Sequence, residues 1–271
     1  MANGSKSLVV YSDIHIGSKY SVCSEHPERE DDSDYRPSPN QKKLLDGWYS
    51  SIDEIQQKPK ALIINGEPID GDNRRTLGDS VWSVNLNDQM REAVKLIKEI
   101  KYENLFFVKG SGYHITKDAT NFEQTIAEKL GARKYKSVMG NQTYADYEAT
   151  IEMFGKHIHF THHVAYSGWW MYRPTPISRE LVKMHFAHKE NGFHTDVLIR
   201  SHVHYYVEVR FPHTKGLTTP AWKFPDGFFY RKGEPEIPTI GNIEIIVEPN
   251  GKIEIEPHLV EVDFKKPVAH L

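Results

Sequence analysis

Five short runs rich in Val, Ile, Leu and Phe are the feature that most constrains the fold of this 271-residue chain. They read SLVVYS, ALIIN, NLFFVK, HIHFT and DVLIR, and each has the length and composition of a buried strand. Apolar residues recur at helical spacing over residues 40–57 and 85–101, between the first three runs. A third helix is expected to start near Thr120, which has capping-box spacing with Glu123. Strands that alternate with helices predict a mostly parallel α/β sheet.

The later part of the chain is richer in strands. The segment ATIEMFGKHIHFTH predicts a hairpin that turns at Gly155, and NIEIIVEPNGKIEIEPHLVEV predicts another with Asn250-Gly251 at its turn. A further helix is expected over TPISRELVKMHFAHKENG, with Pro176 near its start and Gly192 after its end.

We expect a single domain over residues 1–271, because no linker or internal repeat divides the chain. It carries a polar insert near 18–40, a loop-helix insert near 164–191 and a C-terminal β-hairpin region near 240–262. Both inserts follow strand ends, where loops carry function in α/β folds.

Charge and cysteine content narrow the function classes. A formal net charge of −3 gives no global attraction to nucleic acid or to an anionic membrane, so phosphate recognition has to be local. The only cysteine, Cys23, excludes an intrachain disulfide and a cysteine-based zinc site. No apolar run approaches the roughly 18 residues of a membrane span, and the N-terminal MANGSKS is no secretory signal. We therefore expect a cytoplasmic protein with no membrane partner.

Side chains that can bind metal follow all five expected strands. They are Asp13 and His15, then Glu67 and Asp70, then His114, then His162 and His163, and finally His202 and His204. Each signal is weak alone, but the carboxyl ends of such strands converge on one edge of an open sheet, where ligands bind. Imidazole and carboxylate together suit Zn, Mn, Fe or Ni better than Ca or Mg.

The order of these residues resembles the calcineurin-like metallophosphoesterase family, and within it the compact phage and prokaryotic members. The family pattern is D-x-H, G-D-x-x-D, G-N-H-D or G-N-H-E, a lone His, and G-H-x-H. This chain has SDIHIG, NGEPID, GSGYH, THH and SHVHYY in the same order, from about residue 7 to 210. The resemblance implies a four-layer α/β/β/α sandwich with a two-metal centre at the strand ends. It also implies hydrolysis of a phosphomonoester or phosphodiester by metal-activated hydroxide.

The resemblance implies a role for each matching residue. The first metal would be held by Asp13, His15 and His204, the second by His162 and His202, and both by Glu67 as a bridging carboxylate. Asp70 would orient a ligand from behind. His114 would be the catalytic histidine beside the scissile phosphate, and His163 is the alternative to His162.

Two departures from the family pattern concern the second metal. Glu67 is one methylene longer than the family's aspartate, and Ser111 stands roughly where an asparagine ligand is expected. His114 also comes two residues late. We therefore expect two divalent transition-metal ions (Mn, Ni, Zn or Fe), the second bound more weakly.

The substrate side is less constrained. Arg74, His163 and Arg173 are candidates for contacting the phosphoester, although a solvated surface charge is the simpler interpretation for each arginine. Trp169 and Trp170 either wall the cleft, stack on a base or pack in the core. Two alternative functions remain open: a nuclease acting on DNA or RNA, and a catalytically degenerate member of the family that serves as a binding scaffold.

Overall fold

The computed structural model describes residues 4–55, 58–73, 78–112, 116–117, 120–192, 194–227 and 238–262. Within these ranges the chain forms two large β-sheets and four α-helices, with two small two-stranded sheets beside them. The two small sheets pair β4 (Thr116–Lys117) with β5 (Thr120–Asn121) and β6 (Tyr135–Lys136) with β7 (Gln142–Thr143).

The first large sheet has the strand order β15-β14-β1-β2-β3-β8. Its strands are β1 (Lys6–Tyr11), β2 (Ala61–Asn65), β3 (Leu105–Val108), β8 (Ala145–Asp146), β14 (Ile240–Val247) and β15 (Ile253–Val260). The pairs from β1 to β8 are parallel, whereas the β14–β15 hairpin joins β1 antiparallel. The carboxyl ends of β1, β2 and β3 therefore meet at one edge.

The second large sheet has the order β12-β13-β11-β10-β9. Its strands are β9 (Glu148–Met153), β10 (Lys156–Thr161), β11 (Val197–Arg200), β12 (Val207–Arg210) and β13 (Lys215–Thr218). Strands β10, β11 and β13 are parallel, and β9 and β12 are antiparallel edges.

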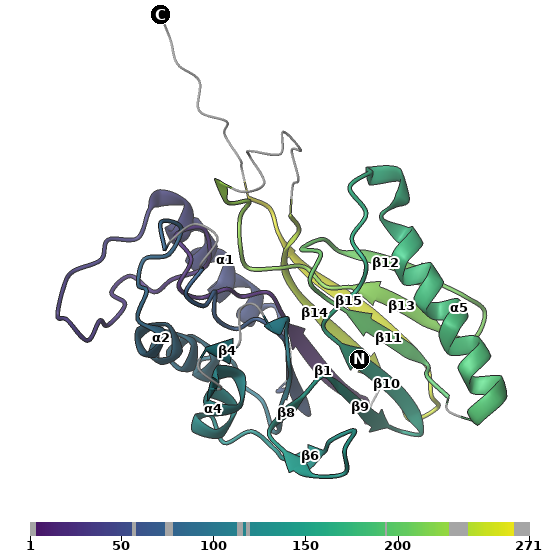
Figure 1. Ribbon diagram of the computed structural model, residues 1–271. Helices are drawn as coiled ribbons and strands as arrows, with labels where there is room; N and C mark the ends of the chain where they lie inside the picture. Colours follow the sequence, from purple (N-terminus) through teal and green to yellow (C-terminus); the bar gives the residue numbers. More distant parts are fainter. Residues whose placement is uncertain are drawn as a thin grey trace, which may run out of the picture.

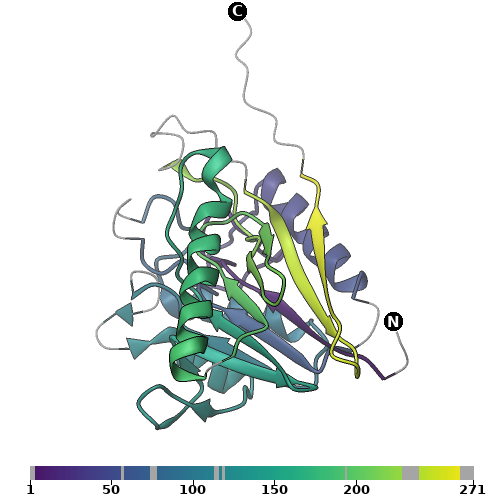
Figure 2. The ribbon, with the colours of Figure 1, turned by 90° about the vertical axis from the view of Figure 1, so that its right-hand side faces the viewer.

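The helices lie outside the two sheets (Figure 1). Helices α1 (Pro39–Asp53), α2 (Leu86–Lys98) and α4 (Phe122–Lys129) cover the first sheet. Helix α5 (Pro174–Asn191), which follows the short helix η2 (Trp170–Tyr172), lies over the second sheet (Figure 2). The result is the expected four-layer α/β/β/α sandwich.

Side-chain alternation along the strands builds both cores. On β1, Leu8 and Val10 point into the core between the two sheets, whereas Val9 and Tyr11 point into the core beneath the helices. Successive strand residues face opposite sides, so a strand buried on both faces is apolar throughout. This explains why four of the five runs carry no polar alternation. The exception is HIHFT, in which Ile158 and Phe160 lie in the core between the sheets and alternate with histidines.

Two expectations about local structure need correction. Helix α4 is capped by Asn121, whose side chain accepts the N–H of Gln124, and Thr120 belongs to β5. Glu123 is therefore not the partner of a capping box. The strand ends also come from two stacked sheets, because β10 and β11 pair with each other and not with β3.

The expected turns are confirmed. Strands β9 and β10 meet at Gly155, which has a φ of 72°, and β14 and β15 meet at Asn250-Gly251. Gly192 ends α5 in the left-handed conformation. In the part of the chain that the structure describes, no helix is both long and apolar enough to cross a bilayer.

Candidate metal centre

The loops that follow β1 and β2 are hydrogen-bonded to each other along their backbones. The N–H of Asp13 donates to the carbonyl of Gly66 at 3.1 Å, and the N–H of His15 donates to the carbonyl of Glu67 at 3.0 Å. This pairing continues the parallel ladder of β1 and β2 beyond the strands, so the two motifs are held side by side.

Five of the candidate ligands have left-handed backbone conformations. Their φ angles are 48° for Asp13, 51° for His15, 55° for Glu67, 74° for His202 and 57° for His204. Residues other than glycine rarely adopt this region, at a cost of about 1–3 kcal/mol each, and such residues cluster at functional sites. The strand-end loops are therefore shaped to present these side chains, at some cost to stability.

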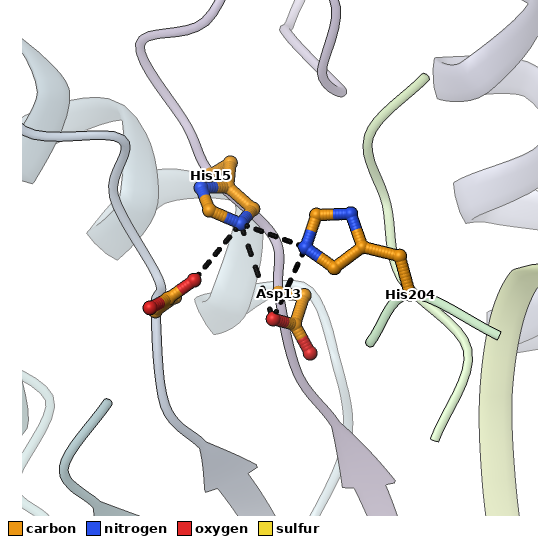
Figure 3. Close-up of side chains that lie close together, drawn as sticks. Asp13, His15 and His204 are labelled. Carbon is orange, nitrogen blue, oxygen red and sulfur yellow. Dashed lines mark hydrogen bonds and ion pairs between the residues drawn. The ribbon is translucent and has the colours of Figure 1, made fainter. Parts of the chain in front are cut away.

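A first group of donors consists of Asp13, His15, Glu67 and His204, whose ligand atoms lie within 4.8 Å of one another. Nε2 of His15 is 3.0 Å from Oε2 of Glu67 and 3.2 Å from Nε2 of His204. Nε2 of His204 is 3.3 Å from Oδ1 of Asp13. Figure 3 shows Asp13, His15 and His204 lying close together, the first two from the loop after β1 and His204 from the loop after β11.

A second group consists of Glu67, His162 and His202. Nε2 of His162 lies 3.3 Å from Oε1 of Glu67, and Nδ1 of His202 lies 4.0 Å from the same oxygen. Glu67 thus directs one carboxylate oxygen to each group. This is the arrangement of a carboxylate that bridges two ions.

Several buried atoms at this place fit metal ligation. Oδ1 of Asp13, Nε2 of His162 and Nδ1 of His202 are buried and have no hydrogen-bond partner among the described residues. Oδ2 of Asp13, by contrast, accepts hydrogen bonds from the Ser12 hydroxyl and the N–H of His202. Buried polar atoms normally have hydrogen-bond partners. A carboxylate oxygen and imidazole nitrogens that lack such partners and lie close together suit a divalent transition metal.

Hydrogen bonds behind the rings select which nitrogen faces the centre. Nδ1 of His15 lies 3.0 Å from Oδ1 of Asp70, and Nδ1 of His162 lies 2.7 Å from the carbonyl oxygen of Asn65. Each oxygen accepts a hydrogen bond from Nδ1–H and leaves Nε2 as the atom that faces the centre. Asp70 lies behind the ring of His15, a candidate ligand. Asp70 in turn accepts from the buried ammonium group of Lys223 at 2.9 Å.

Glu123 holds the loop of the shared carboxylate. Its side chain is fully buried, and it accepts the N–H of Glu67 at 2.9 Å and the N–H of Gly110 at 3.0 Å. A Cβ on Gly110 would lie 2.6 Å from Cγ of Glu67, so a larger residue there would displace the candidate bridge. Burial raises the pKa of Glu123 to about 7, although the two N–H donors oppose the shift.

The electrostatic environment separates the two second-group histidines. Burial lowers the pKa of His162, but the charges of Glu67 and Asp13 outweigh it and raise the pKa to about 10. Burial lowers the pKa of His202 to about 4. Burial opposes ionisation of Asp13, but His162 and His204 bring its pKa below the usual range. The raised pKa of His162 reflects the negative charges of Glu67 and Asp13, which also favour a bound cation.

The remaining sequence candidates lie in different places. His163 is exposed, and its ring lies 4.8 Å from that of His202, so His162 is the member of the pair that enters the cluster. The guanidinium of Arg173 lies between the rings of Trp170, at 4.0 Å, and Tyr205, at 4.4 Å. His114 and Arg74 lie outside the described residues.

Two residues close to the centre were not identified from the sequence. Glu123 was interpreted as a helix cap, and Lys223 lies in PAWKFPDG, which carries no motif. Both act through tertiary contacts with residues more than fifty positions away. No local pattern signals such contacts.

No protein-family model and no curated protein matches the sequence. Solved structures with a similar fold include a protein from Streptococcus pneumoniae described as a predicted phosphoesterase. It is 11% identical, with 95% of this chain and 92% of that chain covered and a TM-score of 0.40. Vps29 complexed with Zn²⁺, from Entamoeba histolytica, is 11% identical, with coverage of 93% and 97% and a TM-score of 0.45.

A third structure is described as a novel archaeal phosphodiesterase and is 13% identical, with coverage of 93% and 99% and a TM-score of 0.42. Similarity at this level carries no argument about function.

Proposed function

We propose that this protein is a metal-dependent phosphoesterase of the calcineurin-like type, with one domain over residues 1–271, that hydrolyses a phosphomonoester or a phosphodiester. One observation carries the proposal: two groups of buried imidazole and carboxylate donors share Glu67 at the strand ends of two stacked sheets. A shared carboxylate between two donor sets is suited to a pair of ions about 3.5–4 Å apart.

Each residue of the candidate metal centre has its own proposed role. Asp13, His15 and His204 would hold one ion, His162 and His202 the other, and Glu67 both. Divalent ions bound there would polarise the phosphoryl group and lower the pKa of water. Asp70 and the carbonyl of Asn65 orient two of the rings, and Glu123 fixes the backbone of Glu67. His114 is the candidate proton donor to the leaving oxygen.

The cluster contains carboxylates, so it repels phosphate unless cations are present. Asp13 and Glu67 are both buried and belong to the same four-residue group. A phosphoester would therefore bind only to the loaded protein, and removal of metal is expected to abolish substrate binding as well as turnover.

The decisive experiment is reconstitution. The metal-free protein is supplied with Mn²⁺, Ni²⁺, Zn²⁺ or Fe²⁺, and hydrolysis of an aryl phosphomonoester and an aryl phosphodiester is followed beside elemental analysis. The matched pair His162→Ala and His163→Ala changes one buried and one exposed histidine. We expect loss of metal only in His162→Ala, together with most of its activity. Tight metal binding without any phosphoester turnover would contradict the proposed activity and indicate a metal-stabilised binding scaffold instead.

A second candidate, nuclease activity, is favoured by the exposed aromatic segment around η2. Tyr166, Trp169, Trp170, Met171 and Tyr172 are 45%, 70%, 58%, 72% and 55% exposed. Exposed rings stack on unpaired bases and contribute about 1–3 kcal/mol per base. Arg173, held between Trp170 and Tyr205, links this segment to the residue that follows His204.

The nuclease candidate is tested with single-stranded DNA. Salt-dependent binding that quenches tryptophan fluorescence in the wild type and is lost in Trp169→Ala would support it. Hydrolysis of small phosphodiesters without any binding of single-stranded DNA or RNA would rule it out.

A further inference from the structure

We propose that Glu244, Glu256 and His258 form an additional divalent-metal site, separate from the candidate metal centre, on the β14–β15 hairpin. Their donor atoms lie within 4.8 Å of one another. The chemical class is a transition-metal ion such as Zn²⁺, because the donors are one imidazole and two carboxylates. The inference does not depend on the proposed phosphoesterase function.

The strand register brings the three side chains to one face. Glu244 of β14 pairs directly with Glu256 of β15, and His258 lies two residues further along β15 on the same side. Glu244 also pairs with Val9 of β1, whose side chain points into the helix-side core. The cluster therefore faces α1, away from the core between the two sheets.

Two glutamates that pair directly across neighbouring strands repel each other, and a cation between them would offset the repulsion. Opposed residues on an antiparallel pair have Cβ atoms about 4.5–5.5 Å apart, and like charges there are destabilising. Glu54, at the C-cap of α1, adds a third carboxylate 3.1 Å from Nδ1 of His258. Among the described residues, no lysine or arginine forms an ion pair with any of these three carboxylates.

The contacts of His258 have the geometry of a metal-binding imidazole. Nδ1 faces the Glu54 carboxylate, and Nε2 lies 3.3 Å from Oε2 of Glu244. A carboxylate behind a ring fixes the tautomer and leaves the other nitrogen for the metal. Two donors about 2.1 Å from a tetrahedral Zn²⁺ are about 3.4 Å apart, close to the observed separation.

The second carboxylate oxygen of Glu244 supports the site independently of the distances between the donors. Glu244 is 1% exposed, and its Oε1 is buried without a hydrogen-bond partner among the described residues. A buried carboxylate oxygen left unsatisfied is costly. A protonated His258 would balance one of the three carboxylates and leave Oε1 unsatisfied, whereas a divalent ion would add a second positive charge and could be coordinated by that oxygen.

Such an ion would tie the C-terminal end of α1 to the outermost strand of the first sheet. Metal that binds only the folded state raises stability by RT ln(1 + [M]/Kd), which is about 2.7 kcal/mol at a hundredfold excess over Kd. The expected role is structural, because the site lies on the helix-facing side of the sheet and not at its strand ends.

The test counts Zn²⁺ bound to the full chain after metal removal and dialysis against Zn²⁺. Glu256→Gln and His258→Gln are compared with the wild type and with Glu254→Gln. The control makes the same change two residues away on the same strand, where the glutamate pairs with Lys252. We expect both site variants to bind one Zn²⁺ fewer than the wild type and the control, with phosphoester turnover unchanged.

Thermal unfolding gives a second readout. Zn²⁺ should raise the midpoint of the wild type and of Glu254→Gln by more than that of either site variant. Equal Zn²⁺ stoichiometry in all four proteins would overturn the proposal and leave His258 as an imidazolium ion-paired with Glu244 and Glu54. Glu256 is exposed, so Glu256→Gln decides the question even if His258→Gln does not fold.

Discussion

The hydroxyl and the backbone N–H of Ser111 both donate hydrogen bonds to Oε1 of Glu67. These are the two residues that depart from the metallophosphoesterase pattern in the second and third motifs, and they contact each other. The longer side chain of Glu67 also reaches Nε2 of His15 with its other oxygen. The two departures are therefore in direct contact, and Ser111 donates to a carboxylate that extends about one methylene further than an aspartate.

This pairing predicts the behaviour of Glu67→Asp. Shortening the side chain by about 1.5 Å should break the contact with Ser111 and lower the affinity for the ion near His162. A misplacement near 1 Å costs about 10²-fold in rate, and the double variant Glu67→Asp/Ser111→Asn should recover part of it. A Mn²⁺ titration of the wild type, Glu67→Asp, Ser111→Asn and the double variant, following aryl phosphodiester hydrolysis, measures the coupling. Additive effects of the two substitutions would show that the pair does not act as a unit.

His204→Ala is expected to lose the ion of the first group and with it most activity. Nε2 of His204 lies 3.3 Å from Asp13 and 3.2 Å from His15, so its removal takes one donor from the set of four. Elemental analysis of the purified variant checks the metal content, with His213→Ala as the exposed-histidine control. Full occupancy in His204→Ala would exclude this residue as a ligand.

Glu123→Gln tests a residue that positions the candidate bridge without touching the reacting atoms. The neutral amide accepts hydrogen bonds more weakly than a carboxylate and places an N–H₂ group among N–H donors. We expect destabilisation of about 1–3 kcal/mol and weaker metal binding. Denaturant unfolding and metal titration measure the two effects, beside Glu128→Gln on the exposed face of the same helix. Unchanged metal affinity at reduced stability would make Glu123 a purely structural residue.

His114→Ala is expected to retain both metals and to reduce kcat by about 10²- to 10⁴-fold, the usual range for general acid–base assistance. The prediction rests on the position of His114 in GSGYH, directly after the third strand. A leaving group of low pKa needs little protonation, so the loss should shrink for activated aryl esters. Loss of metal in this variant would make His114 a ligand.

From the surroundings of His159 we predict that the folded protein loses stability in mild acid. His159 lies beneath α5, with Arg200 at 3.3 Å from Nδ1 and Glu148 at 3.7 Å from Nε2, while Glu180 pairs with Arg200. Burial, followed by the charge of Arg200, lowers the pKa of His159 to about 4. The unfolded chain, with a pKa near 6.5, binds the proton more readily.

Stability should therefore be unaffected above about pH 6.5 and fall as the pH drops toward 4, by on the order of 3 kcal/mol. Urea unfolding between pH 7 and 4 measures the slope for the wild type and for His159→Gln. The slope should be smaller in the variant. An identical pH dependence in both proteins would assign the acid sensitivity to other groups.

Local patterns in the sequence determined the strands and the order of the donors along the chain. ALIIN is β2 residue for residue, because a strand buried on both faces has to be apolar throughout. The D-x-H and H-x-H motifs were expected directly after strands. The structure confirms that Asp13 and His15 follow β1 and that His202 and His204 follow β11. Their roles as metal ligands stay a proposal.

The tertiary structure alone decided which side chains meet. His162 enters the cluster and His163 does not, because the face of β10 that carries Ile158 and Phe160 packs against the first sheet. The contacts of Glu123 with Glu67, and of Glu244 with His258, join residues distant in sequence or on neighbouring strands. Periodicity specifies which residues share a face of one element, but the partner of that face is chosen by packing between elements.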